Sequence, residues 1–340
     1  MASIPLTPLS YWLHKQSISR HLRSVLRYGS FRKYVNLVKA YFAYLRGSTK
    51  ISSMPAFLKV EICRYCEVNC LYCYPARENS LYPLESLLYP LESYKQLIDQ
   101  LKDSIFLVSL YDIGEPLHNP QVLDYIRHAH QHRVGTAISS SLSIEREDRF
   151  WRDLATSGLD HLVVAIDGIS PEVYNHYRRN GQLDLVMSNM RKLLAFKNEA
   201  DSRLFIEWQM IDFPWNRSEQ LEAEKMAYQL GCDLFRIIPD LSVPHYGRRP
   251  SRRESRVGGT TPPLMGTSAI RDRNCVLPFI LFFVTAHNDV RLCYKVYHHD
   301  MCIGNLTGNS FSDIWNGNEI ARVRDRKQIC DREGCQTCWE

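Results

Sequence analysis

Four of the eleven cysteines of this 340-residue chain stand close together in the stretch CRYCEVNCLYC, residues 63–73. Thiolates at such spacings can form disulfides, bind zinc or hold an iron–sulfur cluster. The sequence shows no signal-peptide pattern, so we expect a cytoplasmic protein in which clustered cysteines are metal ligands rather than disulfides. Which of the four cysteines bind a metal therefore decides the chemistry.

The last three of these cysteines, Cys66, Cys70 and Cys73, have the spacing C-x3-C-x2-C. On a loop, this spacing can place three thiolates around one face of a small inorganic cluster. A structural zinc site takes four ligands, usually in two pairs, and no matching pair of His or Cys follows within about 20 residues. Electron-transfer iron–sulfur clusters also take four cysteines, so a set of three leaves one iron open to a cofactor or substrate.

The elements that must position this loop are short apolar runs of strand length. Six of them alternate with amphipathic stretches of helical length, which predicts repeated βα units and a parallel sheet, either open and doubly wound or an incomplete barrel. The predicted strands are residues 56–62, 105–111, 134–139, 161–167, 203–211 and 234–239, and the predicted helices are 93–103, 120–132, 146–157, 183–197 and 217–230.

Polar motifs follow the first four predicted strands. The cysteine loop comes after the first strand, GEP at 114–116 after the second, SSS at 139–141 after the third and DG at 167–168 after the fourth. The carboxyl ends of parallel strands lie at one edge of a sheet, where the ligands of such folds gather. We therefore expect these four segments to form one site.

The C-x3-C-x2-C spacing, with Tyr72 directly before the last cysteine, resembles the signature of the radical SAM enzymes. The resemblance implies a partial (β/α)6 barrel of the TIM type and a [4Fe–4S] cluster whose open iron binds S-adenosylmethionine. In that family one electron, here expected from a flavodoxin- or ferredoxin-type donor, cleaves the cofactor to a 5′-deoxyadenosyl radical that abstracts hydrogen from the substrate. Cys63 stands where the family commonly has Ser or Thr, so we expect it to be a bystander.

The same resemblance assigns cofactor contacts to residues at the strand ends. It implies that Gly114 and Glu115 receive the methionine ammonium group, because that contact needs a carboxylate and a close backbone approach. It places Ser141 at a polar group of the cofactor and counts Tyr72 among the cofactor-binding residues. A simple turn is the alternative at the serine cluster.

Two further residues follow from the resemblance farther along the chain. Asp167, in a segment similar to the family's SIDG, supports the ribose or the barrel rim, and a structural turn is the alternative. Arg178 is the expected partner of the cofactor carboxylate, with Arg179 as the second choice. The alternative at this position is an ordinary solvated arginine.

Six more cysteines lie near the end of the chain. The stretch from Cys275 to Cys293, the GNL segment with the Ile-Trp pair after it, and the final Cys335-x2-Cys338 resemble the SPASM or twitch extension of radical SAM enzymes. The resemblance implies a small α+β extension in which these four cysteines hold one auxiliary [4Fe–4S] cluster. Asn288 stands where the family usually has Gly, and Asn tolerates the same left-handed backbone.

Three cysteines are left outside these two ligand sets and Cys63. The sequence does not exclude a second, incompletely ligated auxiliary cluster at Cys302 and Cys330. A zinc site with four thiolates in place of the auxiliary cluster is another alternative. Cys232 stands apart from both groups, and we expect it to be a small buried apolar residue.

The net charge of +5 is concentrated in the first fifty residues, which hold nine Lys or Arg and no Asp or Glu. Their apolar residues recur at helical spacing, so we expect one or two helices docked on the main domain with a solvated basic face. Peripheral contact with an anionic membrane and an organellar transit peptide are the alternatives. No run of about 18 successive apolar residues exists in the chain, so we expect no membrane-spanning helix. The arginines of residues 240–274 lack interleaved aromatics, so we expect no nucleic-acid partner.

These features predict four segments: a basic helical segment 1–55, a radical SAM core 56–240, a linker 241–274 and an auxiliary-cluster domain 275–340. We expect a radical SAM oxidoreductase or maturase whose auxiliary cluster oxidises the substrate radical or holds the substrate. The substrate hypotheses are a small sugar or aminocyclitol, a ribosomally made peptide, and a lipid or glycolipid at a membrane. Dehydrogenation, epimerisation and cross-linking are all open outcomes, and an iron–sulfur carrier or zinc protein is the alternative of another class.

Overall fold

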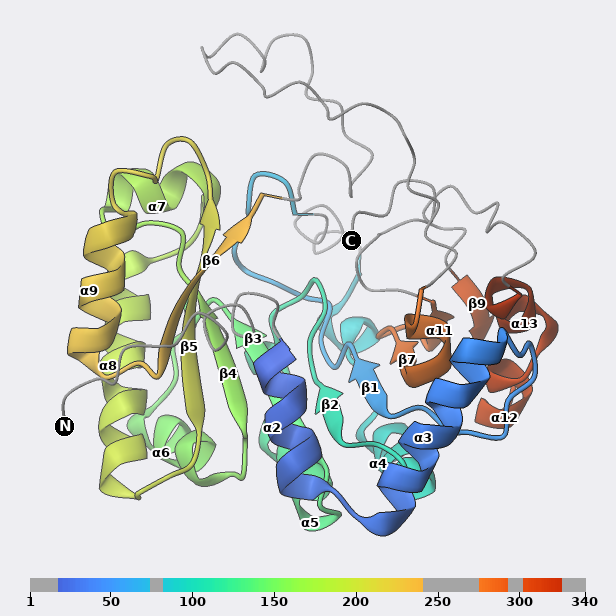
Figure 1. Cartoon of the computed structure of the whole chain (residues 1–340). Helices are drawn as coiled ribbons and strands as arrows, with labels where there is room; N and C mark the ends of the chain where they lie inside the picture. The colour runs from blue at the N-terminus through green and yellow to red at the C-terminus, as the bar shows by residue number, and fades with distance from the viewer. Residues whose placement is uncertain (1–17, 74–81, 241–274, 293–301, 326–340) are drawn as a thin grey trace, which may run out of the picture.

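The computed structural model describes residues 18–73, 82–240, 275–292 and 302–325. All six predicted strands are present, and they pair in parallel and in chain order (Figure 1). They are β1 (Phe57–Val60), β2 (Leu107–Ser109), β3 (Gly135–Ser140), β4 (His161–Ala165), β5 (Phe205–Asp212) and β6 (Leu234–Pro239). The fold is therefore the predicted α/β architecture with a partial (β/α)6 barrel.

The five predicted connecting helices are also present. They are α4 (Leu91–Leu101), α5 (Val122–Gln131), α6 (Asp148–Thr156), α8 (Leu183–Glu199) and α9 (Gln220–Leu230). One more helix, α7 (Pro171–Tyr177), is too short to show an apolar period, but Pro171 at its start and the Ser170 cap on the Val173 N–H explain where it begins. Two short 3-10 turns, η2 (Leu84–Leu87) and η3 (Pro116–His118), complete the described barrel.

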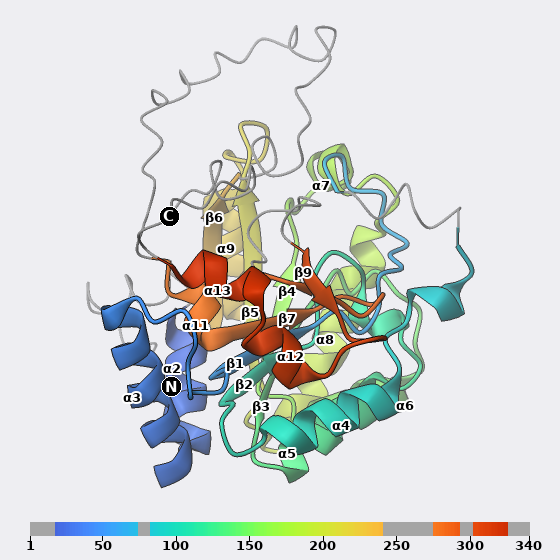
Figure 2. The ribbon, with the colours of Figure 1, turned by 90° about the vertical axis from the view of Figure 1, so that its right-hand side faces the viewer.

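The two faces of the sheet differ in chemistry because side chains alternate along each strand. One face buries Leu58, Val108, Leu162 and Trp208 in a single apolar core with the surrounding helices. The side chains that point to the other face include four buried charged or titratable groups on the strands, and a fifth follows β1 directly. They are Lys59, His161, Glu207 and Arg236 on the strands and Glu61 after β1. Figure 2 shows that α4, α5 and α6 lie on one side of the sheet and the N-terminal helices on the other.

The N-terminal segment forms two helices, α2 (Ile18–Tyr28) and α3 (Phe31–Arg46), as predicted. Ser30 caps the start of α3, and Gly47 ends it in the left-handed region at φ 61°. The helices are docked on the barrel: the Arg27 guanidinium pairs with Asp160 at 2.8 Å, and the Lys33 ammonium donates to the Arg133 carbonyl at 2.7 Å. Of the helices in the described residues, none has the length and apolar character needed to cross a membrane.

The described part of the C-terminal extension continues the barrel sheet. After α11 (Leu277–Ile280), β7 (Leu281–Val284) pairs in parallel with β1, while β8 (Asp289–Arg291) and β9 (Cys302–Asn305) add antiparallel strands. Asn288 takes the left-handed backbone expected of it, with φ 64°. The helices α12 (Phe311–Trp315) and α13 (Asn318–Arg324) follow, and the predicted linker 241–274 lies outside the described residues.

The extension and the barrel share one core. The Trp315 indole N–H donates to the Ser53 carbonyl just before β1 at 2.8 Å, and Phe282 of β7 packs against Phe311 of α12 with ring centroids 4.7 Å apart. The buried Arg324 guanidinium donates to the carbonyls of Pro278 and Trp315 at 2.9 and 2.8 Å. The nine described strands therefore form one continuous sheet with β1 in its interior.

Candidate cofactor site at the carboxyl ends of the strands

The cysteine loop leaves β1 and gathers its last three cysteines beside an apolar cluster. Cys70 belongs to this cluster, and Cys66 and Cys73 are partly buried against it. The loop is anchored to the end of α7, because the Leu71 N–H donates to the Tyr177 carbonyl at 2.9 Å. None of the three forms a disulfide in the described part of the chain.

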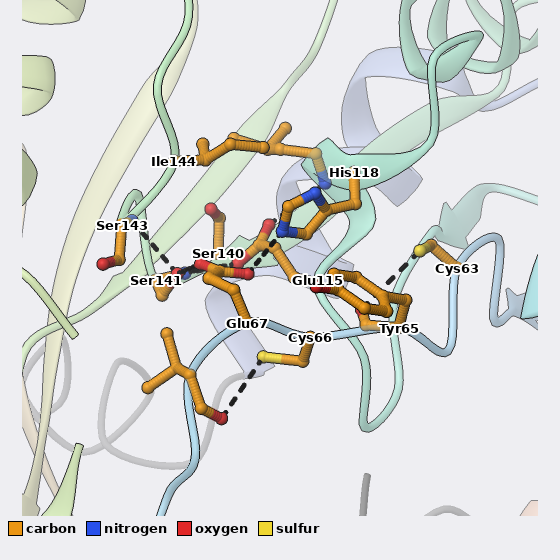
Figure 3. A network of polar contacts seen from close by, with 12 residues as sticks. Cys63, Tyr65, Cys66, Glu67, Glu115, His118, Ser140, Ser141, Ser143 and Ile144 are labelled. Carbon is orange, nitrogen blue, oxygen red and sulfur yellow. Dashed lines mark hydrogen bonds and ion pairs between the residues drawn. The ribbon is translucent and has the colours of Figure 1, made fainter. Parts of the chain in front are cut away.

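Cys63 lies apart from the other three cysteines. It is buried, its thiol donates to the Tyr65 carbonyl at 3.6 Å, and Figure 3 places it beyond Tyr65 as seen from Cys66. Burial raises the pKa of the Cys63 thiol to about 12. Burial raises the pKa of Cys66 and Cys70 as well, so the role of Cys63 as a bystander stays a prediction.

The three clustered thiols are a donor set that fits an iron–sulfur cluster. Burial raises the pKa of Cys66 well above its usual value and that of Cys70 to about 11, although the Arg178 charge opposes the shift at Cys70. A buried thiolate needs positive charge nearby, and the irons of a cubane supply it. Three thiols on one loop, partly enclosed by apolar side chains, therefore fit a cubane in the number and the chemistry of its ligands.

Glu115 is the buried acid next to the cysteine loop. Its Oε2 accepts hydrogen bonds from the Ser141 N–H at 2.8 Å and the Ser141 hydroxyl at 3.0 Å, and its Oε1 accepts from the Leu117 N–H at 3.0 Å. Burial, and next the neighbouring Glu67 carboxylate, raise the pKa of Glu115 above its usual value. The structure therefore brings Glu115 and Ser141 together from the ends of two neighbouring strands.

Two residues that the sequence reasoning missed complete this network. Glu67 lies inside the C-x3-C loop, where its Oε1 accepts from the Ser141 hydroxyl at 3.2 Å and its Oε2 pairs with the His118 Nε2 at 2.5 Å. The Tyr65 ring packs edge-on against His118 with centroids 4.8 Å apart (Figure 3). An acid between two predicted ligand cysteines was the one available sequence signal for Glu67.

Gly114 allows two backbones to approach each other. A Cβ at this position would lie 2.2 Å from the Cys63 carbonyl oxygen and 2.6 Å from the Arg64 Cα. The next residue then hydrogen-bonds the loop directly, because the Glu115 N–H donates to the Tyr65 carbonyl at 2.7 Å. The backbone at Gly114 is therefore in close contact with the backbone of the cysteine loop.

Asp167 and Arg178 form a buried ion pair. The Arg178 Nε donates to the Asp167 Oδ2 at 2.7 Å, and the Asp167 Oδ1 accepts from the Ile211 N–H at 2.7 Å. The Arg178 Nη1 also lies 3.8 Å from the Cys70 sulfur. Arg178 is only 9% exposed, so it is not the solvated arginine considered as an alternative, whereas Arg179 is exposed.

An aromatic group borders the thiols. The Tyr72 ring lies 6.2 Å from that of Tyr177, which contacts Phe213 at 4.6 Å, and Phe213 stacks on Trp215 at 4.4 Å. The Asn216 amide donates to the Asp167 carbonyl at 3.0 Å and fixes the loop that carries these rings. Sequence reasoning missed Phe213, Trp215 and Asn216, because they follow the fifth strand without a recognisable motif.

The second cysteine set is only partly within the described residues. Cys275 is half-buried before α11, and Cys302 begins β9 with its thiol 3.4 Å from the Gly304 carbonyl. Cys293, Cys330, Cys335 and Cys338 lie outside the described residues, so the auxiliary ligand set stays a prediction. Cys232 is buried as expected, and burial raises the pKa of its thiol to about 12.

Comparison with known families identifies the class of this protein. A model of the radical SAM superfamily matches residues 60–201, and a model of the SPASM iron–sulfur cluster-binding domain matches residues 275–339. The chain therefore belongs to the radical SAM superfamily and carries a C-terminal SPASM domain. Its cofactors are S-adenosylmethionine, the [4Fe–4S] cluster that binds it and an auxiliary [4Fe–4S] cluster.

Individual relatives are distant. GTP 3′,8-cyclase of Limosilactobacillus fermentum is 23% identical over 134 residues, which are 39% of this chain and 40% of the relative, so the match spans less than half of that enzyme. Among solved structures, Streptococcus suis SuiB bound to S-adenosylmethionine has a TM-score of 0.62 at 15% identity, over 93% of this chain and 79% of SuiB. The enzyme anSMEcpe with bound AdoMet and the Cp18Cys peptide has a TM-score of 0.53 at 11% identity, over 78% of this chain and 81% of anSMEcpe. These likenesses establish the shared fold.

Proposed function

We propose that Cys66, Cys70 and Cys73 hold the cluster at which this enzyme cleaves S-adenosylmethionine to start hydrogen abstraction from a polar substrate. One observation carries the proposal. Glu67, inside the cysteine loop, bonds both Ser141 and His118, and Ser141 bonds Glu115, so three strand ends are tied together beside the thiols. This is the arrangement that a cofactor bound to an open iron requires, since its other groups must be held by fixed protein partners.

Each residue of the site has a role that its surroundings support. When bound, the cluster and S-adenosylmethionine supply a 5′-deoxyadenosyl radical after uptake of one electron from a flavodoxin- or ferredoxin-type donor. Glu115 offers a carboxylate to the methionine ammonium group, and Ser141 fixes its orientation. Arg178, held by Asp167, keeps a positive charge beside Cys70 and would pair with the methionine carboxylate.

The auxiliary cluster has a separate proposed role. Cys275, Cys293, Cys335 and Cys338 would hold it in the SPASM domain, whose model match covers all four. It would accept an electron from the substrate radical or hold the substrate. The parallel pairing of β7 with β1 supports this role, because it fixes the domain beside the strand that leads into the cysteine loop.

The polar face of the sheet supports a hydrogen-bonding substrate. Lys59 pairs with Asp112 at 2.8 Å, and Glu207 accepts hydrogen bonds from His161 at 2.9 Å and from the Arg236 Nε at 2.6 Å. Buried charges of this kind suit a sugar, an aminocyclitol or a peptide better than a hydrocarbon chain. SuiB and anSMEcpe, which share the fold, have been crystallised with the peptides SuiA and Cp18Cys.

The test is anaerobic reconstitution followed by iron and sulfide counts and an assay for 5′-deoxyadenosine. We expect about eight irons per chain, for two cubanes, with cleavage of S-adenosylmethionine. Cys66→Ser should lose about four irons and all cleavage, while Cys63→Ser should keep both. Loss of cluster and cleavage in Cys63→Ser would show that the ligand set is wrong, and bound zinc without cleavage would overturn the proposal.

A further inference from the structure

The two N-terminal helices expose a concentrated set of large apolar side chains. Twelve such side chains are exposed among the described residues, and eight of them lie on α2 and α3. These eight, here called the α2–α3 apolar surface, are Leu22, Leu26, Phe31, Tyr34, Val38, Tyr41, Phe42 and Leu45. Single exposed apolar residues are ordinary on a protein, but a group of them on neighbouring elements marks an interaction surface.

The surface on α3 is one continuous face of the helix. Phe31, Tyr34, Val38, Tyr41 and Leu45 recur every three or four residues, which places them on one side. The other side of the helix is held by the protein through buried Lys33 and Ala40, and Asn36 donates to the Met54 carbonyl at 2.9 Å. One side of α3 therefore contacts the rest of the protein, and the opposite side exposes apolar side chains to solvent.

Basic side chains surround this apolar face. Residues 1–50 hold nine Lys or Arg and no acid, so with a total of +5 the remaining residues carry 5 − 9 = −4. Arg27, Arg32, Lys39, Arg46 and Lys50 are exposed, and the Arg46 guanidinium lies 5.8 Å from the Phe42 ring. Of the ion pairs described on these helices, the one between Arg32 and Asp103 is fully at the surface and contributes little.

We propose that the α2–α3 apolar surface docks this enzyme on an anionic membrane. A helix that lies in a bilayer interface combines an aromatic and aliphatic face with flanking Lys and Arg, which meet the acyl boundary and the lipid phosphates respectively. Both features are present here, on helices that are already fixed to the barrel. The proposal stands on this surface alone and does not depend on the proposed chemistry.

The position of the α2–α3 apolar surface determines which way the cofactor site faces when the enzyme is docked. Helix α3 and the last residue of α2 contact residues that precede the strands: Met54 before β1, Asp103 before β2, Arg133 before β3 and Asp160 before β4. The start of α2 reaches farther along the sheet, because the Arg20 guanidinium donates to the Tyr111 hydroxyl after β2 at 2.8 Å. The cysteine loop, Glu115, Ser141 and Asp167 follow the same strands, at the opposite ends (Figure 1). Docking therefore turns the cofactor site away from the bilayer, which tethers the enzyme near the membrane while a water-soluble substrate reaches the site.

The test uses the full chain with its clusters and a flotation assay with vesicles of phosphatidylcholine alone or mixed with phosphatidylglycerol. We expect flotation with the anionic vesicles and its loss at about 0.5 M salt, where charges are screened beyond a few ångströms. Replacing Lys39 and Lys50 by Gln should weaken the partition coefficient about 25-fold, since each basic residue near the surface contributes about 1 kcal/mol.

A matched pair of leucines tests the apolar part. Leu26 is 71% exposed on α2 and Leu221 is 66% exposed on α9, so Leu26→Ser and Leu221→Ser make the same chemical change at similar exposure. Leu26→Ser should lower vesicle binding several-fold, and Leu221→Ser should leave it unchanged. Equal effects of both, or no flotation of the unmodified chain, would overturn the proposal.

Two other occupants give different results in the same experiments. If a second copy covers the surface, light scattering will show a dimer that Phe31→Ser, Phe42→Ser and Leu45→Ser together convert to monomer, without vesicle binding. If a soluble acidic protein covers the α2–α3 apolar surface, the chain alone will not bind vesicles and will remain monomeric. Either result overturns membrane docking, and neither touches the cleavage assay, so failure here is distinguishable from failure of the proposed function.

Discussion

His161 joins the N-terminal helix to the polar face of the sheet through both of its ring nitrogens. Its Nδ1 accepts from the Arg23 guanidinium at 2.8 Å, and its Nε2–H donates to the Glu207 carboxylate at 2.9 Å. Burial lowers the pKa of His161 from 6.5 to about 4. Burial alone would raise the pKa of Glu207, but the His161 hydrogen bond and the Arg236 charge bring it down to about 2. The folded state therefore keeps a neutral histidine beside a charged glutamate.

This arrangement predicts that the free energy of unfolding decreases as the pH is lowered. The folded state resists protonating His161 while the unfolded chain takes up the proton near pH 6.5, so stability falls as the pH is lowered from 6.5 towards 4. Between pH 7 and pH 5 the loss in free energy of unfolding should be about 2 kcal/mol. Glu207 adds its own loss only below its ordinary pKa of 4.5.

The measurement is denaturant unfolding of the reconstituted protein at the two pH values. His161→Gln keeps a donor for Glu207 and an acceptor for Arg23 but cannot titrate, so this variant should show little of the loss. Both proteins carry the same clusters, and acid lability of the clusters therefore cancels in the comparison. An equal loss in both proteins would contradict the role given to His161.

Some residues of the site could be predicted from the sequence because they stand in local motifs, and others could not because only the fold pairs them. The cysteines, Glu115 and Ser141 stand in short motifs at predicted strand ends, and the structure brings Glu115 and Ser141 within hydrogen-bond distance. Glu67 and His118 pair across 51 residues of chain, and no local pattern reports such a partner. Arg178 was expected from a motif, but its ion pair with Asp167 depends on the fold of α7, which is too short to predict.

At the scale of elements, the loop after β2 must fit against the loop after β1. Gly114 makes this possible, because a Cβ there would lie 2.2 Å from the Cys63 carbonyl oxygen, a backbone atom that cannot rotate away. Gly114→Ala should therefore displace the cysteine loop and destabilise the protein by about 1–3 kcal/mol. Iron content after reconstitution should fall with it.

Gly308→Ala is the matched control, since a Cβ at that position meets nothing within 4 Å. We expect its thermal midpoint and iron content to stay at the values of the unmodified protein. If Gly114→Ala also kept its iron, the contact between the two loops would not be needed to shape the thiol set.

Strands and long helices were predictable because burial leaves a periodic signal in the chain. The structure places β4 at His161–Ala165 and α8 at Leu183–Glu199, close to the predicted 161–167 and 183–197. For α3 we predicted a solvated basic face, whereas the structure also exposes an apolar face of this helix. Its period is visible, but a period alone does not say whether the apolar side faces the core or the solvent.

For the whole molecule, the extension belongs to the same sheet as the barrel. The register pairs Phe57 with Leu281 and Val60 with Val284, residues more than 200 positions apart. Strand pairing at this separation leaves no mark on either segment, which is why the sequence predicted a separate domain at 275–340 without its attachment. Because β1 is hydrogen-bonded on both sides, barrel and extension should unfold together.

Trp315 is the residue that tests this coupling. It is 1% exposed in α12, donates to the Ser53 carbonyl at 2.8 Å and lies under the Arg324 guanidinium at 4.5 Å. Trp315→Ala should cost about 3–5 kcal/mol, because it leaves a large cavity and an unpaired carbonyl. The loss should appear in the barrel as well, as a lower denaturation midpoint by far-ultraviolet circular dichroism that coincides with release of iron.

Phe42→Ala, at a half-exposed aromatic position outside the core, should change the free energy of unfolding by no more than about 0.5 kcal/mol. A barrel transition that stays in place while only the extension melts would show that the continuous sheet does not make the molecule one cooperative unit.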